Sequence, residues 1–276
     1  MTQDASQFVG NIPEHYDRAL GPVIFEDYAN DIARRAADLK PSRILEIASG
    51  TGIVSRQLRN HLPESASLVV TDLNPPMLEV ARSKFRPEEQ VEFAPANAMG
   101  FDYPDGHFDL AVCQFGVMFF PDKQASFREA LRVLSSSGTY LLSTWGAQAD
   151  NPFAQITQDL VSETFPDDTP GFYRVPFSYP GPDQVISDLT AAGFVNVAHD
   201  TITIQKTVTD LHKFARGLVF GNPLNDEIKA RGGIGVTSEE FAVRLEKRFR
   251  EAWGEAPTNM PLQATVFTAQ KPRHSS

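Results

Sequence analysis

Two glycines and one carboxylate are the residues of this sequence whose spacing most clearly indicates chemistry. Gly50 and Gly52 follow an apolar run, and they allow the backbone to turn sharply and approach a ligand without a Cβ in the way. Asp72 follows Gly52 by 20 residues, the spacing expected for an acid that accepts hydrogen bonds from ribose hydroxyls. Each feature alone also fits an ordinary strand-to-helix turn. Together they predict a nucleoside-binding site.

The residues after the second glycine restrict which nucleotides fit. A triphosphate-binding Walker loop requires Lys and then Ser or Thr, whereas Ile53 and Val54 follow Gly52. The dinucleotide fingerprint is matched over residues 50–55 except at its last glycine, where Ser55 stands. A nicotinamide-dependent (NAD(P)) oxidoreductase therefore remains an alternative, as does a non-catalytic nucleoside-binding protein of the same fold.

The composition favours a small ligand. The chain has 276 residues, 41% of them hydrophobic and 22% charged, as in a globular protein with a substantial core. Its net charge of -10 argues against nucleic acid as a partner. A lone cysteine, Cys113, and the lack of a basic leader or a roughly 20-residue apolar run predict a cytoplasmic protein with no membrane span. We expect no metal site, and we make no prediction about the oligomeric state.

Short apolar runs alternate with helical patterns along the first half of the chain. The runs typical of buried strands are 43–48, 68–73, 91–94, 108–113 and 139–144. Between the last two, Asp122 is expected to cap a helix and Gly138 to end it. Right-handed crossovers then give a doubly wound α/β sheet, whose ligand crevice lies beyond the carboxyl ends of the strands. The glycine loop, Asp72 and Gln114 fall at that edge, and Asn97 follows the third strand.

Six segments between residues 40 and 145 carry the pattern of a known family. They are 44–52, 71–78, 96–98, 105–109, 113–120 and 130–138. In their order and content they resemble the class I S-adenosylmethionine-dependent methyltransferases, in particular the type 11, quinone-biosynthesis group. Glu46 fills the acid position before the glycines, Asp72 the position of the ribose acid, and Met77 the start of the next helix.

The resemblance implies a Rossmann-like doubly wound sheet of seven strands with a reversed last hairpin near 194–205 and 262–270, plus a helical cap. It implies S-adenosyl-L-methionine as the cofactor. The cofactor-binding residues that it implies are Tyr16, Glu46, Ala48, Ser49, Gly50, Gly52, Asp72, Leu73, Met77, Asn97, Ala98, Gln114 and Phe115.

Two positions depart from the family pattern. Ala48 replaces the first of three glycines, so we expect a backbone φ below zero at that residue. Asn97 replaces the usual aspartate. Its amide oxygen can still accept a hydrogen bond from the adenine amine, without a charge to strengthen the bond.

The segments around the core contain no motif with a known role, and only their composition is informative. We divide the chain into an N-terminal helical lid (1–39), a cofactor-binding core (40–148) and cap insertions (149–193 and 206–261). The insertions are rich in aromatic residues and include an amphipathic helix through Phe241 and Phe249. They suit a small apolar or aromatic acceptor, or else form a satellite core. The predicted substrate-pocket residues are Phe115, Met118 and Phe119, which directly follow a strand end.

Methyl transfer from a sulfonium is an in-line displacement with an activated donor, so alignment can supply much of the rate. A general base helps with a hydroxyl acceptor but is not required for every acceptor. The resemblance places the N-terminal stretch over the cofactor, which makes His15 the candidate base. Most histidines have structural or surface roles, and Tyr16 is the better candidate for a cofactor contact.

Overall fold

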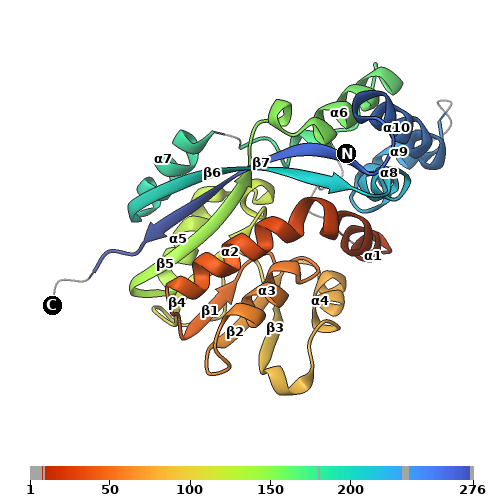
Figure 1. Ribbon diagram of the computed structural model, residues 1–276. Coiled ribbons are helices and arrows are strands. Elements are labelled where there is room, and N and C mark those ends of the chain that lie inside the picture. Colours follow the sequence, from red (N-terminus) through yellow and green to blue (C-terminus); the bar gives the residue numbers. More distant parts are fainter. Residues whose placement is uncertain (1–7, 9, 180, 232–235, 274–276) are drawn as a thin grey trace.

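The computed structural model describes residues 8, 10–179, 181–231 and 236–273. A seven-stranded sheet of order β3-β2-β1-β4-β5-β7-β6 forms its centre (Figure 1). The strands are β1 (Arg43–Glu46), β2 (Ser67–Asp72), β3 (Val91–Pro95), β4 (Phe108–Gln114), β5 (Leu134–Trp145), β6 (Val195–Val208) and β7 (Thr258–Gln270). Strands β1 to β5 are parallel, and β7 is antiparallel to β5 and β6. The predicted sheet with a reversed last hairpin is confirmed.

The helices include one stretch of π-helix near the N-terminus. They are α1 (Ile12–His15), the π-helix η1 (Tyr16–Phe25), α2 (Glu26–Asp38), α3 (Ile53–His61), α4 (Pro75–Arg82), α5 (Lys123–Val133), α6 (Pro152–Thr164), α7 (Pro182–Ala192), α8 (Leu211–Phe220), α9 (Leu224–Ala230) and α10 (Ser238–Trp253), with the 3₁₀ turns η2 (Pro87–Glu89), η3 (Val117–Phe119), η4 (Gln148–Asp150) and η5 (Phe172–Arg174).

Strand alternation divides the core into two layers. Ile44 and Val112 point to the face that α2 and α3 cover, where they join one apolar cluster. Leu45 and Ala111, the neighbouring positions, belong to a second cluster that includes side chains of α5 and α7. Helix α2 lies within residues 1–39, and all its buried side chains except Tyr28 belong to the first of these clusters. It therefore covers the sheet, while α1 and η1 lie near the strand ends (Figure 1).

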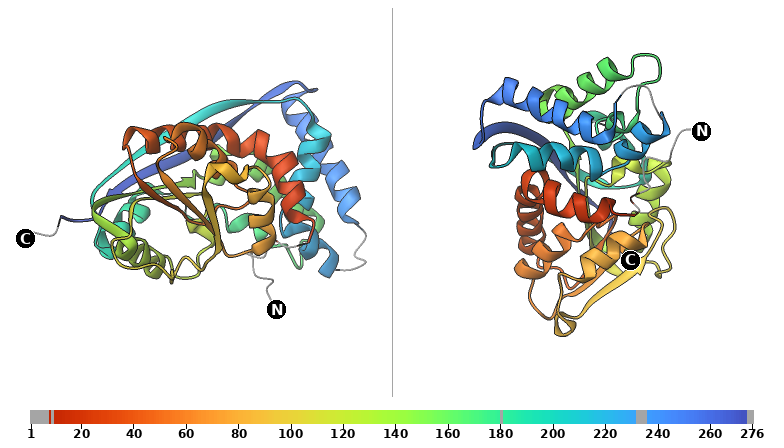
Figure 2. Two further views of the ribbon diagram at one scale, coloured as in Figure 1. Left: turned by 90° about the horizontal axis from the view of Figure 1, so that it is seen from below. Right: turned by 90° about the vertical axis from the view of Figure 1, so that its right-hand side faces the viewer.

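The cap lies at the carboxyl ends of the parallel strands. Helices α6, α8, α9 and α10 gather there, and the N-terminal helices lie between them and the part of the core formed by β1 to α4 (Figure 2). The contact between η1 and α8 is close because two glycines of the α8 region face η1. A Cβ added at Gly217 would lie 2.6 Å from the Cβ of Ala19, and one at Gly221 would lie 3.0 Å from the backbone nitrogen of Tyr16.

The helix before β5 starts as predicted but ends earlier. The Asp122 carboxylate accepts a hydrogen bond from the backbone N–H of Ala125 at 2.8 Å, which confirms the N-cap. The predicted end at Gly138 is wrong, because the helix ends at Val133 and the chain enters β5 directly. The pairing of β4 with β5 shifts beyond Leu134, so the serines and Gly138 form an irregularity inside the strand.

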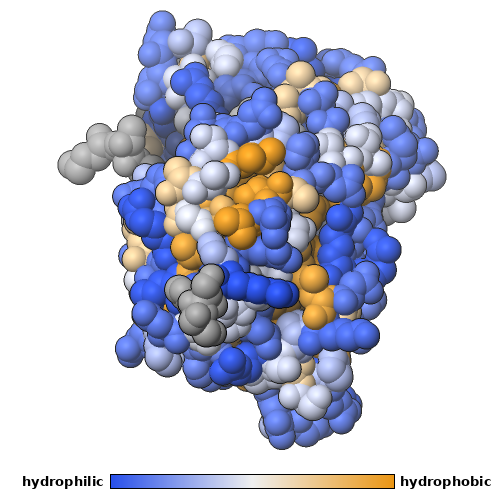
Figure 3. All heavy atoms as spheres, turned by 90° about the vertical axis from the view of Figure 1, so that its left-hand side faces the viewer, coloured by the Kyte–Doolittle hydropathy of each residue, from blue (hydrophilic) through white to orange (hydrophobic). Residues whose placement is uncertain are grey.

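The face of the molecule in Figure 3 is mostly hydrophilic, with apolar side chains near its centre. The large apolar residues with the greatest exposure in the described chain are Leu39, Leu73, Val195 and Val243. Within the described residues, no helix has the length and apolar character needed to cross a bilayer.

Candidate active site

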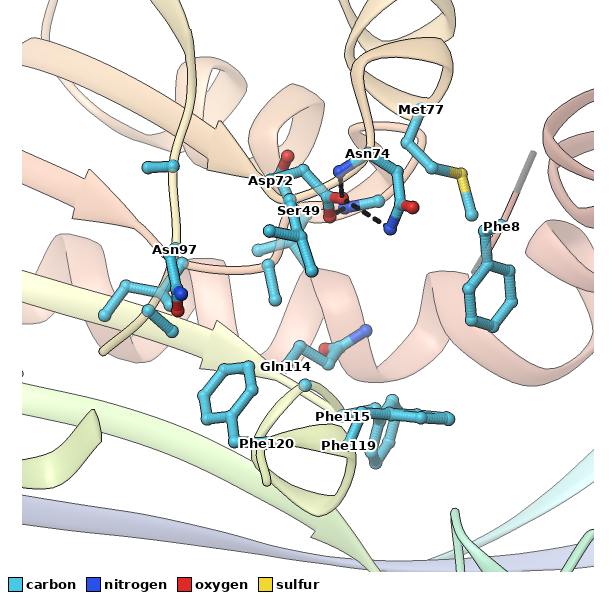
Figure 4. Close-up of a pocket in the computed structure, with 18 of the residues that line it drawn as sticks. Phe8, Ser49, Asp72, Asn74, Met77, Asn97, Gln114, Phe115, Phe119 and Phe120 are labelled. Carbon is cyan, nitrogen blue, oxygen red and sulfur yellow. Dashed lines mark hydrogen bonds between the residues drawn. The ribbon is translucent and has the colours of Figure 1, made fainter. Parts of the chain in front are cut away.

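A cavity of about 520 Å³ lies at the carboxyl edge of the sheet. The glycine loop after β1 and the segments after β2, β3 and β4 line it together with the N-terminal stretch, as the doubly wound topology predicts (Figure 4). Predicted cofactor residues that line it are Tyr16, Ala48, Ser49, Gly50, Asp72, Leu73, Met77, Asn97, Ala98, Gln114 and Phe115.

The glycine loop begins with a residue in the left-handed region. Ala48 has φ +54°, so the expected negative φ is wrong. The backbone N–H groups of Ile47 and Ser49 donate to the carbonyls of Val112 and Thr71 at 2.8 and 2.9 Å, which fixes the chain on both sides of Ala48. Its methyl group is accommodated because Gly116 lies opposite, where an added Cβ would be 2.7 Å from the Cβ of Ala48.

The two glycines of the loop have different roles. A Cβ added at Gly50 would meet no protein atom within 4 Å, and the residue lines the cavity with φ +55°. A Cβ at Gly52 would lie 2.7 Å from the Cβ of Ala81 in α4, and Gly52 is not among the cavity-lining residues. Gly50 therefore leaves space for a ligand, whereas Gly52 permits close packing under the loop.

Asp72 joins the loop to the end of β2. Its carboxylate accepts hydrogen bonds from the backbone N–H groups of Gly50 and Asn74, both at 2.8 Å, and from the Asn74 side-chain amide at 3.3 Å (Figure 4). Burial raises the pKa of Asp72, and the N–H groups of Asn74 and Gly50 oppose this shift. Because Asp72 lines the cavity, its carboxylate can also meet a hydroxyl there.

Glu46 lies behind the loop and does not line the cavity. The residue is 2% exposed, and within the described structure its Oε2 has no hydrogen-bond partner. Burial raises the pKa of Glu46 to about 8; Ser55 opposes this shift, and the negative charge of Asp72 adds to it. Glu46 is therefore positioned to support the loop from behind rather than to contact a ligand in the cavity.

Two cavity-lining side chains have a buried polar atom without a hydrogen-bond partner in the described structure. These atoms are the Oγ of Ser49 and the Oε1 of Gln114. The Gln114 amide N–H donates only a long bond, 3.4 Å, to the carbonyl of Phe25. Unpaired polar atoms are costly in an apolar interior, and here they offer acceptors for the donor groups of a polar ligand.

Asn97 lies on the side of the cavity away from Phe8 (Figure 4). Its Oδ1 accepts a hydrogen bond from the backbone N–H of Met99 at 3.0 Å. One lone pair of this oxygen is thus used inside the protein, and the other remains for an amine donor.

Aromatic side chains form the opposite wall and continue into a second cavity of about 70 Å³. The ring of Phe115 stacks on Trp145 with a centroid distance of 4.0 Å and an angle of 2°. The residues that line both cavities are Phe8, Tyr16, Phe25, Phe115 and Phe119. The first cavity thus opens onto an aromatic chamber.

Besides Glu46 and Gly52, two predicted site residues lie outside both cavities. Met118 is 2% exposed and packs in the core, since the 3₁₀ turn η3 directs Phe119 rather than Met118 toward the cavities. The ring of His15 lies 5.8 Å from that of Phe220 and is not among the lining residues. No histidine is among the residues that line either cavity.

Several lining residues were not predicted from the sequence. They are Phe8, Phe25, Ile47, Ile53, Val54, Asn74, Ala96, Met99, Gly116, Phe120 and Pro121. For Asn74 a local signal existed, because it lies two residues after Asp72 in the turn before α4. For Phe8 no local signal marks the role, because its contacts with Tyr16, Phe119 and Phe172 are tertiary.

The lining of the larger cavity fits an adenosyl amino acid better than a dinucleotide. None of its residues is Lys, Arg or His, so no side-chain cation would balance a pyrophosphate or a 2′-phosphate. The carboxylate of Asp72, the amide of Asn97 and the unpaired Gln114 oxygen match a nucleoside and an ammonium group. Among the described residues, no group of three or more His, Cys, Asp or Glu side chains is placed to hold a metal ion.

Comparisons with known proteins show the family to which the chain is similar. The model of the ubiE/COQ5 methyltransferase family matches residues 12–162. A demethylmenaquinone methyltransferase of Thermus thermophilus is 32% identical over 190 residues, covering 62% of this chain and 83% of that protein. A ubiquinone/menaquinone biosynthesis C-methyltransferase of Pseudomonas savastanoi is 27% identical over 175 residues, covering 59% of this chain and 68% of that protein.

Solved structures show the same fold. A phosphoethanolamine N-methyltransferase of Haemonchus contortus, in complex with S-adenosyl-L-methionine, has a TM-score of 0.61 at 18% identity and covers 98% of this chain and 59% of that one. The YcgJ protein of Bacillus subtilis has a TM-score of 0.56 at 19% identity and covers 90% and 99%. The chain belongs to the ubiE/COQ5 methyltransferase family and is an S-adenosylmethionine-dependent methyltransferase.

Proposed function

We propose that this methyltransferase binds S-adenosylmethionine in the larger cavity and a small apolar or aromatic acceptor at the shared aromatic wall, with the far end of the acceptor in the adjoining chamber. The observation that carries the proposal is the shared wall: five aromatic side chains line both cavities. A methyl group presented at that wall faces the chamber directly. The comparisons support the family and the cofactor, and the geometry supports the class of acceptor.

Each end of the cofactor has complementary groups in the cavity. Asn97 and Ala98 would border the adenine, and the cavity-lining carboxylate of Asp72 would accept a hydrogen bond from a ribose hydroxyl. Ser49, Gly50 and Gln114 would hold the amino-acid end. When bound, the cofactor supplies a methyl group already activated by the sulfonium, and Phe115 and Tyr16 would align the acceptor with it.

Among the described residues that line the two cavities, none is placed as a general base for the acceptor. Asp72, Tyr16 and Tyr173 are the titratable side chains among the residues that line the two cavities. Burial raises the pKa of both tyrosines above the ordinary range, so they stay neutral. The acceptor would therefore react through a nucleophile that needs no protein base, while the aromatic wall excludes water.

A small molecule fits this protein better than a nucleic acid does. The net charge of -10 and the lack of basic side chains in the cavity lining disfavour contact with phosphate groups. We propose that the enzyme acts in the cytoplasm on a metabolite of low molecular weight.

Calorimetric titration with S-adenosylhomocysteine and with NAD tests this assignment. We expect the homocysteine compound to bind and NAD to give no comparable heat. Asp72→Ala should weaken binding of the homocysteine compound by about 1–3 kcal/mol, because a ribose hydroxyl and the Gly50 N–H lose their acceptor. Asp72→Asn, which keeps one oxygen, should lose less.

The exposed Asp102→Ala is the matched control for these variants and should bind as the wild type does. Tight NAD binding without a response to S-adenosylhomocysteine would reverse the assignment to a nicotinamide enzyme. A non-catalytic binding protein predicts cofactor affinity but no methylated product in a mass-spectrometric screen of aromatic acceptors.

A further inference from the structure

Much of the second cavity is built from residues outside the family match. The match ends at residue 162, whereas Phe172, Tyr173, Phe177, Leu218 and Asn222 line the cavity from the cap. The part of the chain that the family model matches thus includes the cofactor side, and the cap forms the far wall. Recognition of the acceptor must be deduced from the cap itself.

The far wall has one polar point. Tyr173 and Asn222 are each 3% exposed, and among the described residues that line the second cavity the other hydrogen-bonding side chains are Tyr16 on the shared wall and Trp145, whose indole N–H can only donate. The Tyr173 hydroxyl donates to the carbonyl of Leu218 at 2.8 Å. The Asn222 amide donates to the same carbonyl at 2.8 Å and to the Tyr173 hydroxyl at 3.3 Å.

Within the protein, Tyr173 and Asn222 use all their side-chain hydrogen-bond donors but keep free acceptor positions. The Asn222 Oδ1 accepts the backbone N–H of Leu224 at 2.9 Å, which leaves one lone pair, and the Tyr173 oxygen also keeps one. A ligand group that meets this point must therefore donate a hydrogen bond. A carbonyl or an ether oxygen would find only acceptors there.

The turn that carries Tyr173 is held in place from outside the cavity. The carboxylate of Glu227 in α9 accepts hydrogen bonds from the backbone N–H groups of Gly171 and Phe172, at 3.2 and 3.1 Å. The polar pair is thus preformed, and binding need not order it.

We infer that Tyr173 and Asn222 determine acceptor specificity by selecting a small aromatic molecule with a hydroxyl or N–H group on the side away from the methylated atom. The inference rests on the proposed function, since it assumes that the far end of the acceptor lies in the second cavity. Tyr173 and Asn222 line this cavity and not the larger one, so the donor group that they recognise lies away from the cofactor.

Binding of phenol, toluene and benzaldehyde to the full chain tests the inference. Trp145 lines the second cavity, and the other tryptophan, Trp253, stacks on Phe249 in the cap. In the Trp253→Phe variant, the fluorescence of Trp145 reports whether a probe occupies the second cavity. The measurement is made with S-adenosylhomocysteine present and at an excitation wavelength that phenol does not absorb. We expect phenol to bind about tenfold more tightly than toluene, the upper range for one hydrogen bond, and benzaldehyde no more tightly than toluene.

Tyr173→Phe should reduce the phenol preference to about threefold or less, because only the Asn222 acceptor remains. Tyr179→Phe is the matched control, since Tyr179 is similarly buried but lines neither cavity, and it should keep the full preference. Equal binding of phenol and toluene, tighter binding of benzaldehyde, no binding of any probe, or a preference that survives Tyr173→Phe would overturn the inference. Calorimetry with S-adenosylhomocysteine on the same proteins separates this failure from failure of the proposed function.

Discussion

At the scale of single residues, the loop geometry depends on a pair of positions far apart in the sequence. Ala48 adopts φ +54°, which costs an L-residue about 1–2 kcal/mol, and Gly116 provides the room for its methyl group. A Cβ at position 116 would lie 2.7 Å from both the Cβ of Ala48 and the Sγ of Cys113. The effect of a substitution at Ala48 therefore depends on the residue at position 116, and the reverse also holds.

This coupling predicts non-additive stabilities. Gly116→Ala should lower the free energy of unfolding by about 1–3 kcal/mol, because the added methyl group overpacks the site. Ala48→Gly should be close to neutral, since relief of the backbone penalty is offset by the greater entropy of glycine in the unfolded chain. Urea denaturation should show that the double variant loses less than the sum of the single losses. Additive losses would contradict the contact.

Glu46 predicts a dependence of stability on pH. Burial raises its pKa from 4.5 to about 8, so between these values the folded protein keeps a proton that the unfolded chain releases. Stability must then fall as the pH rises through this window and stay level above it. The loss should be on the order of a few kcal/mol.

Urea midpoints of the unliganded protein at several pH values between 5 and 9 measure this effect. Glu46→Gln should remove much of the decline, because all other titrating groups remain in the comparison. A wild-type profile parallel to that of the variant would show that Glu46 is ionised when buried.

The candidate site was predictable where chemistry depends on local spacing. Gly50 and Asp72 could be predicted because a turn and an acid about 20 residues apart lie at neighbouring strand ends. The sign of φ at Ala48 was wrong because it depends on Gly116, which is remote in the sequence. Met118 was predicted to line the pocket because it stands between Phe115 and Phe119 in the sequence. The 3₁₀ turn η3, however, determines which of these side chains faces the cavity.

At the scale of elements, the lid is positioned by the cap. The π-helix η1 brings Tyr16 and Phe25 to both cavities, and the α8 region receives η1 through Gly217 and Gly221. The periodicity of apolar residues predicted the five parallel strands and the amphipathic helix α10. It did not predict η1, because apolar periodicity does not register Pro22, which lies inside this helix and lacks the backbone N–H of a regular α-helical hydrogen bond.

Gly221→Ala should therefore impair binding without touching a ligand. Its methyl group would lie 3.0 Å from the Tyr16 nitrogen and 2.6 Å from the carbonyl oxygen of Gly217, so η1 must move. We expect the dissociation constant for S-adenosylhomocysteine to rise about tenfold, comparable to the loss of one good contact, as measured by calorimetry.

Gly181→Ala is the matched control, because a Cβ at Gly181 meets no atom within 4 Å and its φ is -89°. It should bind the cofactor product as the wild type does. If Gly221→Ala also binds normally while folding normally, the position of η1 does not depend on this contact.

At the scale of the whole molecule, the glycine loop, the N-terminal helices and the cap contact one another in that order. The glycine loop meets Tyr16 across the larger cavity, η1 packs on α8, and α8 carries Leu218 to the acceptor chamber. A ligand in the larger cavity therefore restricts η1, and η1 in turn restricts the cap. Helix α7 packs on α5 and β6 instead, and its residues line neither cavity.

This arrangement predicts how hydrogen exchange responds to S-adenosylhomocysteine. Amides that exchange by local opening should slow in the glycine loop, in η1 and also in α8, because ordering of η1 is transmitted through the Gly217 and Gly221 contacts. Amides of α7 should change little. In Gly221→Ala, saturated with the same compound, the slowing in α8 should be smaller than in the wild type. Protection confined to the loop, or equal slowing in α7 and α8, would mean that the cofactor site and the cap respond independently or only through global stabilisation.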